Sequence, residues 1–300
     1  MEIRNVYKAQ VSLLLRVLPE VAKEKCFVLH GGTAINLFIR NMPRLSVDVD
    51  LTYVSIEDRD TSLTNIVEAL KRIKSSIEAA IPETHISLQE KILKLLISTP
   101  KAHIKLEVSQ ANRGLIDGTK EMVLCEKAQD EFAAFCAIDV VPLSQLYGGK
   151  ICAALDRQHP RDLFDIKYLM ENEGFTDEIK KGFILCLLGS NRPLHEMLNP
   201  NLSDQRHAME NHFDGMSYVP FTYDDFEKTR HQLITAVKES LTKEDKDFLL
   251  GFKSLTPDWS VYDFERFPAV QWKLQNLLKL KNNNRSKYDE LVGALKNVLS

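Results

Sequence analysis

A strand with two aspartates is the feature that most constrains the fold of this chain. Asp48 and Asp50 lie in a stretch, residues 45–53, in which apolar and polar residues alternate. Successive side chains of a strand point to opposite faces, so we expect both carboxylates on one face and apolar residues on the other. The apolar positions are Leu45, Val47, Val49, Leu51 and Tyr53. Two neighbouring carboxylates are costly over an apolar core unless a cation lies between them. Because aspartate is also depleted inside strands, the pattern predicts a metal-binding strand rather than an exposed edge strand.

Two adjacent glycines come shortly before this strand. The apolar run of residues 26–29 predicts a short strand that leads into Gly31 and Gly32, and residues 33–41 follow as a helix. Glycines let backbone amides approach an anion closely, and the N-terminus of a helix adds a positive dipole end. Thr33 suits both capping of this helix and contact with a phosphate. The segment is therefore typical of a phosphate-binding turn.

Magnesium is the cation that this arrangement favours, because it is usually held by one or two carboxylates together with substrate phosphates. Arg44 and Ser46 precede the aspartates, and we expect them to reach a triphosphate. Glu107 lies on the alternating segment 103–109 and is a third metal ligand if this strand pairs beside the first; a solvated position is the alternative. Such a metal polarises an α-phosphate and lowers the pKa of an attacking hydroxyl. The pattern predicts metal-assisted phosphoryl or nucleotidyl transfer.

A lysine inside an apolar helix begins a second candidate group. Lys150 follows two glycines within the helical segment 143–157, and Arg157 lies on about the same helical face seven positions later. A lysine in apolar surroundings either extends its ammonium to water or is held there for a charge. We expect Lys150 and Arg157 to neutralise phosphate charge in a transition state.

The helix that follows adds more charges to the same corner. After a break at residues 158–159, the chain places Arg161, Asp162 and Asp165 within one helical turn and a half. A first-turn charge at Asp162 and an (i, i+4) pair of Arg161 with Asp165 are the simple structural interpretations, worth a few tenths of a kcal/mol. The density of charge favours a site, in which Arg161 contacts phosphate and Asp165 accepts a proton or orients the lysine.

Residue 142 divides the pattern into two parts. Before it, helices are expected at residues 5–24 and 62–80, and strands at 92–98, 103–109, 123–124 and 138–141. After it, helices are expected at residues 143–157, 160–173, 233–240, 243–252, 268–281 and 286–299, with irregular structure between 191 and 223. We therefore expect an α+β fold. A catalytic core of residues 1–141, with a mixed sheet and flanking helices, precedes a helical domain of residues 142–300 that completes the active site.

Composition excludes several classes of protein. The 300 residues are 44% hydrophobic and 27% charged, as in ordinary globular proteins. Signal-peptide and membrane-spanning patterns are missing, and five scattered cysteines lack metal-ligand spacing, so we expect a cytoplasmic protein. A net charge of −3 gives no global signature of nucleic-acid binding, although a local basic strip would be enough. Basic residues gather at Lys91, Lys94, Lys101 and Lys105 and again at Lys279, Lys281, Arg285 and Lys287.

Taken together, these motifs resemble the AbiEii/AbiGii family of nucleotidyltransferase-like toxins. The matching segments are residues 31–34 and 44–51, Lys105-Leu106-Glu107, Gly149-Lys150, residues 161–165, Pro257-Asp258-Trp259 and residues 268–277. The resemblance therefore spans nearly the whole chain.

The resemblance implies a polymerase-β-like nucleotidyltransferase core followed by a helical C-terminal domain. It also implies a toxin of a type IV toxin–antitoxin or phage-abortive-infection pair, whose partner is an AbiEi-like antitoxin that represses transcription. Relatives use Mg²⁺ and nucleoside triphosphates, and some add nucleotides to the 3′ end of tRNA, which blocks translation. Carried over to this sequence, Asp48 and Asp50 are metal ligands, Lys150 binds triphosphate and Asp165 is catalytic.

Three functions stay open at this point. The leading hypothesis is a toxin that transfers nucleotides to an RNA acceptor, the tRNA 3′ end. A second is a nucleotidyltransferase that modifies a small molecule or a protein side chain, which the near-neutral net charge favours slightly. A third is a non-catalytic nucleotide-binding partner of a repressor. The third predicts that Asp48→Ala leaves growth inhibition intact, whereas both enzymatic hypotheses predict its loss.

Overall fold

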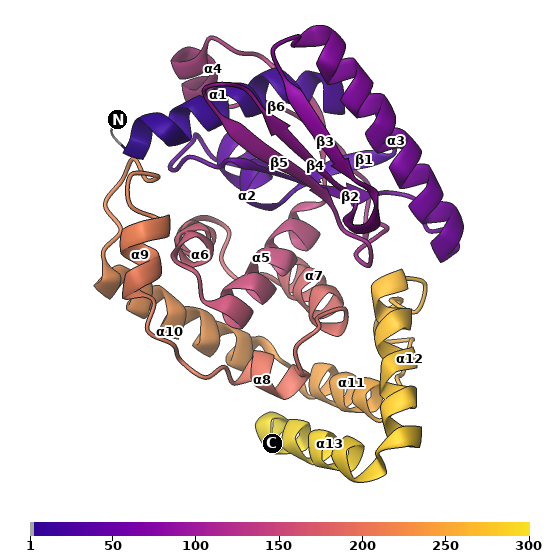
Figure 1. The fold of residues 1–300 in the computed structure, drawn as a ribbon. Coiled ribbons are helices and arrows are strands. Elements are labelled where there is room, and N and C mark those ends of the chain that lie inside the picture. Colours follow the sequence, from indigo (N-terminus) through magenta and orange to yellow (C-terminus); the bar gives the residue numbers. More distant parts are fainter. Residues whose placement is uncertain (1–2) are drawn as a thin grey trace. The chain divides into compact units, whose positions relative to one another are not determined.

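The computed structural model describes residues 3–300, which form two compact units (Figure 1). The first unit comprises the described chain up to Pro142 together with the segment Glu210–Phe221. The second unit comprises Leu143–Met209 and Thr222–Ser300.

Within the described residues, the first unit is built on a seven-stranded mixed sheet. Its strands are β1 (Phe27–His30), β2 (Asp48–Tyr53), β3 (His85–Gln89), β4 (Lys94–Ser98), β5 (His103–Val108), β6 (Lys120–Val123) and β7 (Ala137–Val140). The order across the sheet is β3-β4-β5-β2-β1-β7-β6, with β2 parallel to β5, β1 parallel to β7 and the other neighbours antiparallel. Helices α1 (Ile3–Val21) and α3 (Arg59–Ala80) pack against each other and against the apolar face of the sheet (Figure 1). The expected α+β core with a mixed sheet is confirmed.

The connection from β1 to the aspartate strand begins with a continuous helix that ends at Ile39. Strand β1 ends at His30, and a short helix α2 (Gly31–Thr33) continues into the π-helix η1 (Ala34–Ile39). The helix expected from residue 33 therefore begins two residues earlier, at the first glycine. π-helical turns are rare and occur frequently near functional sites.

The segment Glu210–Phe221 completes the first unit although it comes late in the chain. Its backbone meets the residues that precede β2: the Leu45 amide donates to the Met216 carbonyl at 2.8 Å, and the Tyr218 amide donates to the Pro43 carbonyl at 2.9 Å. Met216 is only 1% exposed. This segment therefore supports the chain just before the two aspartates.

The described part of the second unit is helical. Its helices are α5 (Leu143–Arg157), α6 (Pro160–Asn172), α7 (Asp177–Leu188), α8 (Leu194–Leu198), α10 (Tyr223–Ser240), α11 (Lys243–Lys253), α12 (Pro268–Asn283) and α13 (Arg285–Leu299). Helices α5 and α7 cross closely at two glycines, because a Cβ on Gly148 would lie 2.3 Å from the Gly182 carbonyl carbon. A larger residue at either position would push the two helices apart.

Several elements differ from the sequence-based expectation. Strand β3 and helices α4 (Glu126–Phe132) and α7 were not expected, and the supposedly irregular stretch 191–223 contains α8 and α9 (Arg206–His212). Helix α7 buries residues around most of its circumference, so it lacks the polar face that marks an amphipathic helix. Helix α10 begins ten residues before the expected start, at a capping box formed by Thr222 and Asp225.

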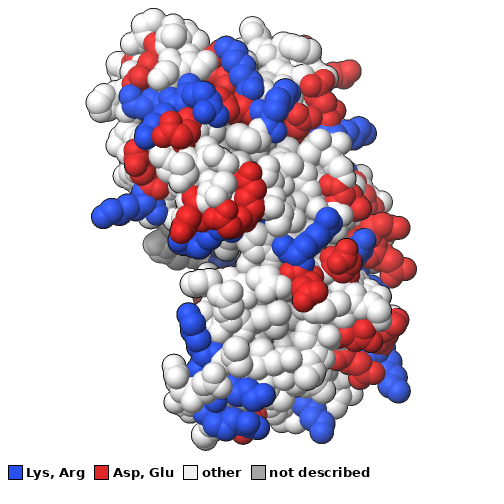
Figure 2. All heavy atoms as spheres, turned by 90° about the vertical axis from the view of Figure 1, so that its right-hand side faces the viewer, with Lys and Arg blue, Asp and Glu red and all other residues white. Residues whose placement is uncertain are grey.

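Charges are distributed without a single dominant sign on the visible surface. On the face shown in Figure 2, lysines and arginines are interspersed with acidic side chains rather than gathered in one basic patch. Over residues 3–300, no helix combines the length and the apolar character that a bilayer crossing requires.

Candidate active site

The residues predicted to form the site fall into two groups, one in each unit. The first unit holds Gly31, Gly32, Thr33, Arg44, Ser46, Asp48, Asp50 and Glu107. The second unit holds Lys150, Arg157, Arg161 and Asp165.

A row of polar side chains crosses four strands of the sheet in the first unit. Strand register places His30 opposite Asp50, Asp50 beside Glu107, and Glu107 opposite Lys94. Residues at equivalent register positions share a face, so these four side chains project to the same side. We call them the cross-strand row. Asp48 lies one step before Asp50 on this face, while the intervening Val49 is fully buried.

Two lysines lie close to the carboxylates of this face. The Lys105 Nζ lies 3.9 Å from the Asp48 Oδ1 and 3.8 Å from the Glu107 Oε2. Lys94 forms a closer ion pair with Glu107. Because Glu107 faces two ammonium groups, its charge is offset without a metal. Glu107 as a metal ligand therefore stays a prediction.

The donor set on β2 fits a divalent cation that a substrate completes. Asp48 and Asp50 supply carboxylate oxygens, and both side chains are partly exposed on the open face of the sheet. Among residues 3–300, no three His, Cys, Asp or Glu side chains are grouped closely enough to hold a metal by themselves. Magnesium commonly takes one or two carboxylates and fills its other positions with water and substrate phosphates. The site therefore fits a metal that arrives with a phosphorylated substrate.

The glycine turn lies directly against Asp50. Gly31 has φ = +73°, and a Cβ at this position would lie 2.3 Å from the Asp50 Oδ2. A Cβ on Gly32 would lie 2.8 Å from the Arg44 Nη2 and 3.0 Å from the Ser46 Oγ. The two glycines thus let the backbone lie close to both the acid and the basic side chain, and their contact with a phosphate stays a prediction.

The Thr33 hydroxyl fastens this turn to the aspartate strand. The side chain is fully buried; its Oγ1 donates to the backbone carbonyl of Asp48 and lies 3.1 Å from the Ser46 Oγ. It makes no capping hydrogen bond to the following helix, so that alternative is wrong. Contact of this hydroxyl with a phosphate stays a prediction.

A pocket of about 390 Å³ opens beside the cross-strand row. All four side chains of the row line it, together with Leu51, Thr52, Ile92 and residues 108–110 and 112. The Thr52 hydroxyl lies 3.4 Å from the Nδ1 of His30 at its edge. Asp50 lines this pocket and also abuts the glycine turn, so it connects the two parts of the site.

The second unit holds a buried cluster of four charges. The Lys150 Nζ lies 2.8 Å from the Asp162 Oδ1 and 3.0 Å from the Asp165 Oδ2. Arg157 donates to Asp162 through its Nε at 2.6 Å and its Nη2 at 3.0 Å. Lys150, Asp162 and Asp165 are at most 7% exposed, whereas the Arg157 side chain is 59% exposed. Helices α5 and α6 thus hold the lysine in one position.

Electrostatics keep the Asp162 carboxylate of this cluster ionised. Burial alone would raise the pKa of the Asp162 carboxyl, but Lys150 and Arg157 outweigh it and hold that pKa well below its usual range. Two cations and two anions balance, so the cluster acts as a fixed hydrogen-bond donor rather than as a long-range attractor of anions. Donors fixed in this way need little reorganisation when a charged group forms beside them.

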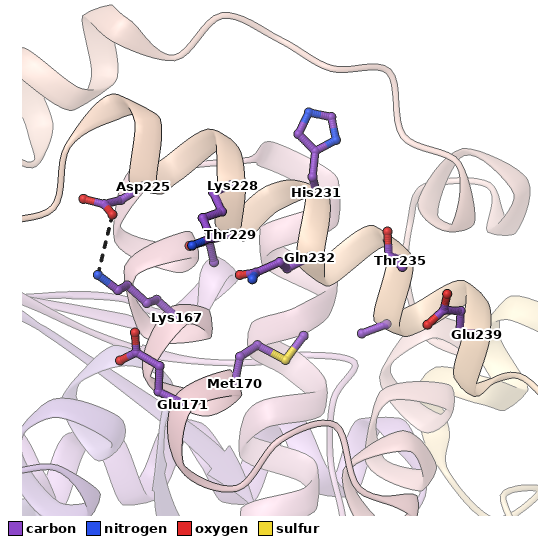
Figure 3. A pocket seen from close by; sticks show the side chains of 11 residues that line it. Lys167, Met170, Glu171, Asp225, Lys228, Thr229, His231, Gln232, Thr235 and Glu239 are labelled. Atoms are coloured by element: carbon purple, nitrogen blue, oxygen red, sulfur yellow. Dashed lines mark ion pairs between the residues drawn. The ribbon is translucent and has the colours of Figure 1, made fainter.

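The second unit also contains a pocket without predicted site residues. It measures about 660 Å³ and lies between α6 and α10, whose side chains face one another in Figure 3. Lys167 and Asp225 form an ion pair of 3.8 Å at one end, and Glu171 and Glu239 add negative charge. This mixed lining selects no ligand class.

Comparison with known proteins identifies the family. The model of the family described as "Nucleotidyl transferase AbiEii toxin, Type IV TA system" matches residues 12–276. This chain belongs to the AbiEii family. It is therefore a nucleotidyltransferase toxin of a type IV toxin–antitoxin system, with a nucleoside triphosphate as substrate and an antitoxin as partner.

A solved structure supports the fold. MenT4, a nucleotidyltransferase toxin of Mycobacterium tuberculosis H37Rv, is similar with a TM-score of 0.61 at 15% sequence identity. The similarity covers 99% of this chain and 95% of MenT4. None of the curated proteins matches the chain.

Asp162 was part of the charged corner that the sequence indicated, but it was not among the predicted site residues because a first-turn charge explained it equally well. In the structure its carboxylate pairs with both Lys150 and Arg157. The available signal was its spacing of 12 residues from Lys150 across a sharp helix–helix break. For Arg161, with its amide capped by His159 at 3.1 Å, contact with phosphate stays a prediction.

Gly31→Ala tests how the turn positions the acid. The substitution places a Cβ against the Asp50 carboxylate and keeps a left-handed φ, so we expect a loss of about 1–2 kcal/mol in unfolding free energy and a lower transfer rate. Urea titration and a nucleotide-transfer assay measure the two effects. Gly118→Ala is the control, because no heavy atom lies within 4 Å of its added Cβ. Wild-type transfer by Gly31→Ala would show that the turn does not fix Asp50.

Proposed function

We propose that this toxin transfers nucleotides from a nucleoside triphosphate to the 3′ end of an RNA, with tRNA as the acceptor and Mg²⁺ as the metal. The observation that carries the proposal is the placement of Asp48 and Asp50 on one strand face, with Asp50 directly against the turn of Gly31 and Gly32. The two carboxylates hold the metal, and the turn with Arg44 and Ser46 holds the phosphates. The metal supplies Lewis-acid polarisation of the α-phosphate and a lower pKa for the attacking hydroxyl.

The chemistry is a single displacement at the α-phosphorus. The 3′-hydroxyl oxygen of the acceptor forms a bond to this phosphorus and loses its proton. The bond from the α-phosphorus to the bridging oxygen breaks, and pyrophosphate leaves from the opposite side. The protein contributes position and fixed charges, which account for most of the catalysis in phosphoryl transfer.

Lys150, Arg157 and Arg161 also bind phosphate in this proposal. Lys150 donates to a phosphate oxygen, and the exposed guanidinium of Arg157 offsets the charge that develops on pyrophosphate. Of the two roles considered for Asp165, orientation of Lys150 is better supported, because its carboxylate is buried and lies 3.0 Å from the ammonium. Asp165 is therefore a positioning residue.

Addition of nucleotides to tRNA accounts for toxicity. A tRNA with an altered 3′ end no longer supports translation, so growth stops until the antitoxin restores control. We propose an AbiEi-like repressor as this antitoxin, abortive infection as a setting in which the pair acts against phage, and the cytoplasm as its place of action.

A labelling assay tests the proposal directly. The protein is incubated with total tRNA, Mg²⁺ and each labelled nucleoside triphosphate in turn, and the products are separated on a denaturing gel. We expect label at the 3′ end of RNA with at least one nucleotide, and its loss on chelation of the metal. Label that appears only on protein or on a small molecule would show that RNA is not the acceptor. It would favour the second hypothesis, a nucleotidyltransferase that modifies a small molecule or a protein side chain.

A further inference from the structure

We propose that the pocket beside the cross-strand row binds the terminal nucleoside of the RNA acceptor and that Asn112 contacts its base. This inference rests on the proposed function and adds the site at which the acceptor is selected. Asn112 and the loop that carries it belong to none of the sequence motifs discussed above.

The position of the pocket favours the acceptor over the triphosphate. Gly32, Arg44 and Ser46 gather at the end of β2 where Asp48 lies, and none of them lines the pocket. The pocket instead extends from Asp50 past the other end of β2, through Thr52 and the residues after β5. In-line transfer requires the attacking and leaving oxygens on opposite sides of the phosphorus. If the phosphates occupy the glycine turn, the attacking hydroxyl therefore approaches from the pocket.

The loop that closes the pocket is tied to the sheet. The Ser109 amide donates to the Leu51 carbonyl at 3.3 Å, and the Gly114 amide donates to the Tyr53 carbonyl at 2.9 Å. Inside the loop, the Asn112 amide donates to the Ser109 Oγ at 3.0 Å. These contacts fix the backbone beneath the Asn112 side chain, which is a requirement for reading a base edge.

The pocket lining offers an apolar surface and several polar groups, and this combination matches a nucleoside. Ile92 is 51% exposed and offers an apolar surface for a base or ribose. The side-chain amide of Asn112 is exposed and makes no hydrogen bond to another described residue, so it can offer both a donor and an acceptor. Bases of single-stranded RNA ends are recognised through such contacts to their edges. A volume of about 390 Å³ falls within the usual range of small-ligand pockets.

Lys91 lies at the rim of the pocket, where the phosphate on the 5′ side of the terminal nucleoside would lie. The Gln110 Nε2 donates to the Lys91 carbonyl at 2.7 Å, which places Lys91 at the rim of the pocket. The Lys91 side chain is exposed, and no carboxylate in residues 3–300 forms an ion pair with it. We assign it to the RNA backbone, where it contributes affinity without base preference.

The test compares Asn112→Ala with the wild type on four short RNAs that differ only in the 3′-terminal base. We expect the KM for the preferred RNA to rise roughly tenfold and the preference among terminal bases to flatten. The KM for the nucleoside triphosphate should stay unchanged. Gln232→Ala, in the separate pocket of the second unit, is the control and should match the wild type.

Lys91→Ala gives a second, different signature. The substitution should weaken the binding of all four RNAs equally. It should also reduce the slope of log affinity against log salt concentration by about 0.7. Both variants alter exposed side chains, and melting temperatures confirm that they fold.

The outcomes separate this inference from the proposed function. If the wild-type enzyme labels no RNA, both the proposed function and the acceptor pocket are wrong. A wild-type enzyme that labels RNA, with Asn112→Ala unchanged in KM and preference, overturns only the acceptor pocket. An effect of Asn112→Ala on the triphosphate KM alone would assign the pocket to the nucleotide and equally overturn the inference.

Discussion

Asp48→Asn is expected to lower the rate of nucleotide transfer by on the order of 10³-fold while the protein stays folded. The substitution removes one of two carboxylate charges on β2 that face the glycine turn, and with it a ligand charge for the metal. The side chain is only partly buried and its partner Lys105 is 3.9 Å away, so little stability depends on it. The initial rate at saturating nucleotide and Mg²⁺ measures the effect. Growth inhibition in cells should be lost in parallel.

Asp139→Asn provides a matched control for this experiment. Asp139 also lies on a strand of the first unit, is 25% exposed where Asp48 is 28% exposed, and pairs with Lys25 at 3.3 Å. It lies on β7, away from the glycine turn in sequence, and should retain the wild-type rate. If Asp48→Asn keeps a rate within a few-fold of the control, metal binding at β2 is ruled out. Growth inhibition that persists without transfer would point to a binding function.

Lys150→Met is the second large effect, and it acts on stability as well as transfer. Removal of the ammonium leaves the buried carboxylates of Asp162 and Asp165 without their shared cation. Breaking a buried ion pair on one side costs about 3–5 kcal/mol. Urea unfolding at neutral pH measures this loss. Transfer by the folded protein should also fall, because the proposed phosphate donor is missing.

The stability loss depends on pH with a definite sign. The folded-state pKa of Asp162 lies below its ordinary value of 3.8, so its contribution is present above about pH 4 and is lost as the pH falls further. In Lys150→Met the carboxyl groups protonate more readily. The difference from the wild type should therefore be largest near neutral pH and smaller at about pH 3.

Lys180→Met separates stability from chemistry. Lys180 is also buried in the second unit and pairs with the buried Asp245 at 3.0 Å, but it belongs to neither predicted group of site residues. We expect a comparable loss of stability with transfer retained by the folded protein.

Retained transfer in Lys150→Met would remove the lysine from the mechanism. If Lys150 and Asp48 serve one triphosphate, Lys150→Met should add little to the defect of Asp48→Asn.

The local part of the site could be predicted from the sequence, because strand alternation and glycine turns are encoded by neighbours in the chain. Asp48 and Asp50 share a face for that reason. The sequence raised Glu107 as a neighbour only on the condition that its strand pairs beside β2, which it does. The complete cross-strand row could not be predicted, because it depends on the register of strands that are separated in the chain. Likewise, Asp162 meets Lys150 only because α5 and α6 meet at a particular angle.

The difference between local and long-range information also explains which helices of the second unit were missed. Helices with one buried stripe, such as α11, were located from their periodicity. Helix α7 packs against several neighbours, including the close crossing of Gly182 with α5, and so carries no such stripe. Glycines on a helix normally lower the expectation of a helix. In this protein, Gly148 and Gly182 allow α5 and α7 to cross closely.

The late segment Glu210–Phe221 has a consequence for synthesis in the cell. Residues 43–45, which lead into the aspartate strand β2, form hydrogen bonds with backbone partners at positions 216 and 218. At about 5–20 residues per second, a ribosome needs roughly 4–16 s to move from residue 142 to residue 221. Nascent or prematurely terminated chains lack these partners throughout that interval. A nascent copy of the toxin therefore cannot complete the backbone support of the segment before β2 until residues 216 and 218 have been made.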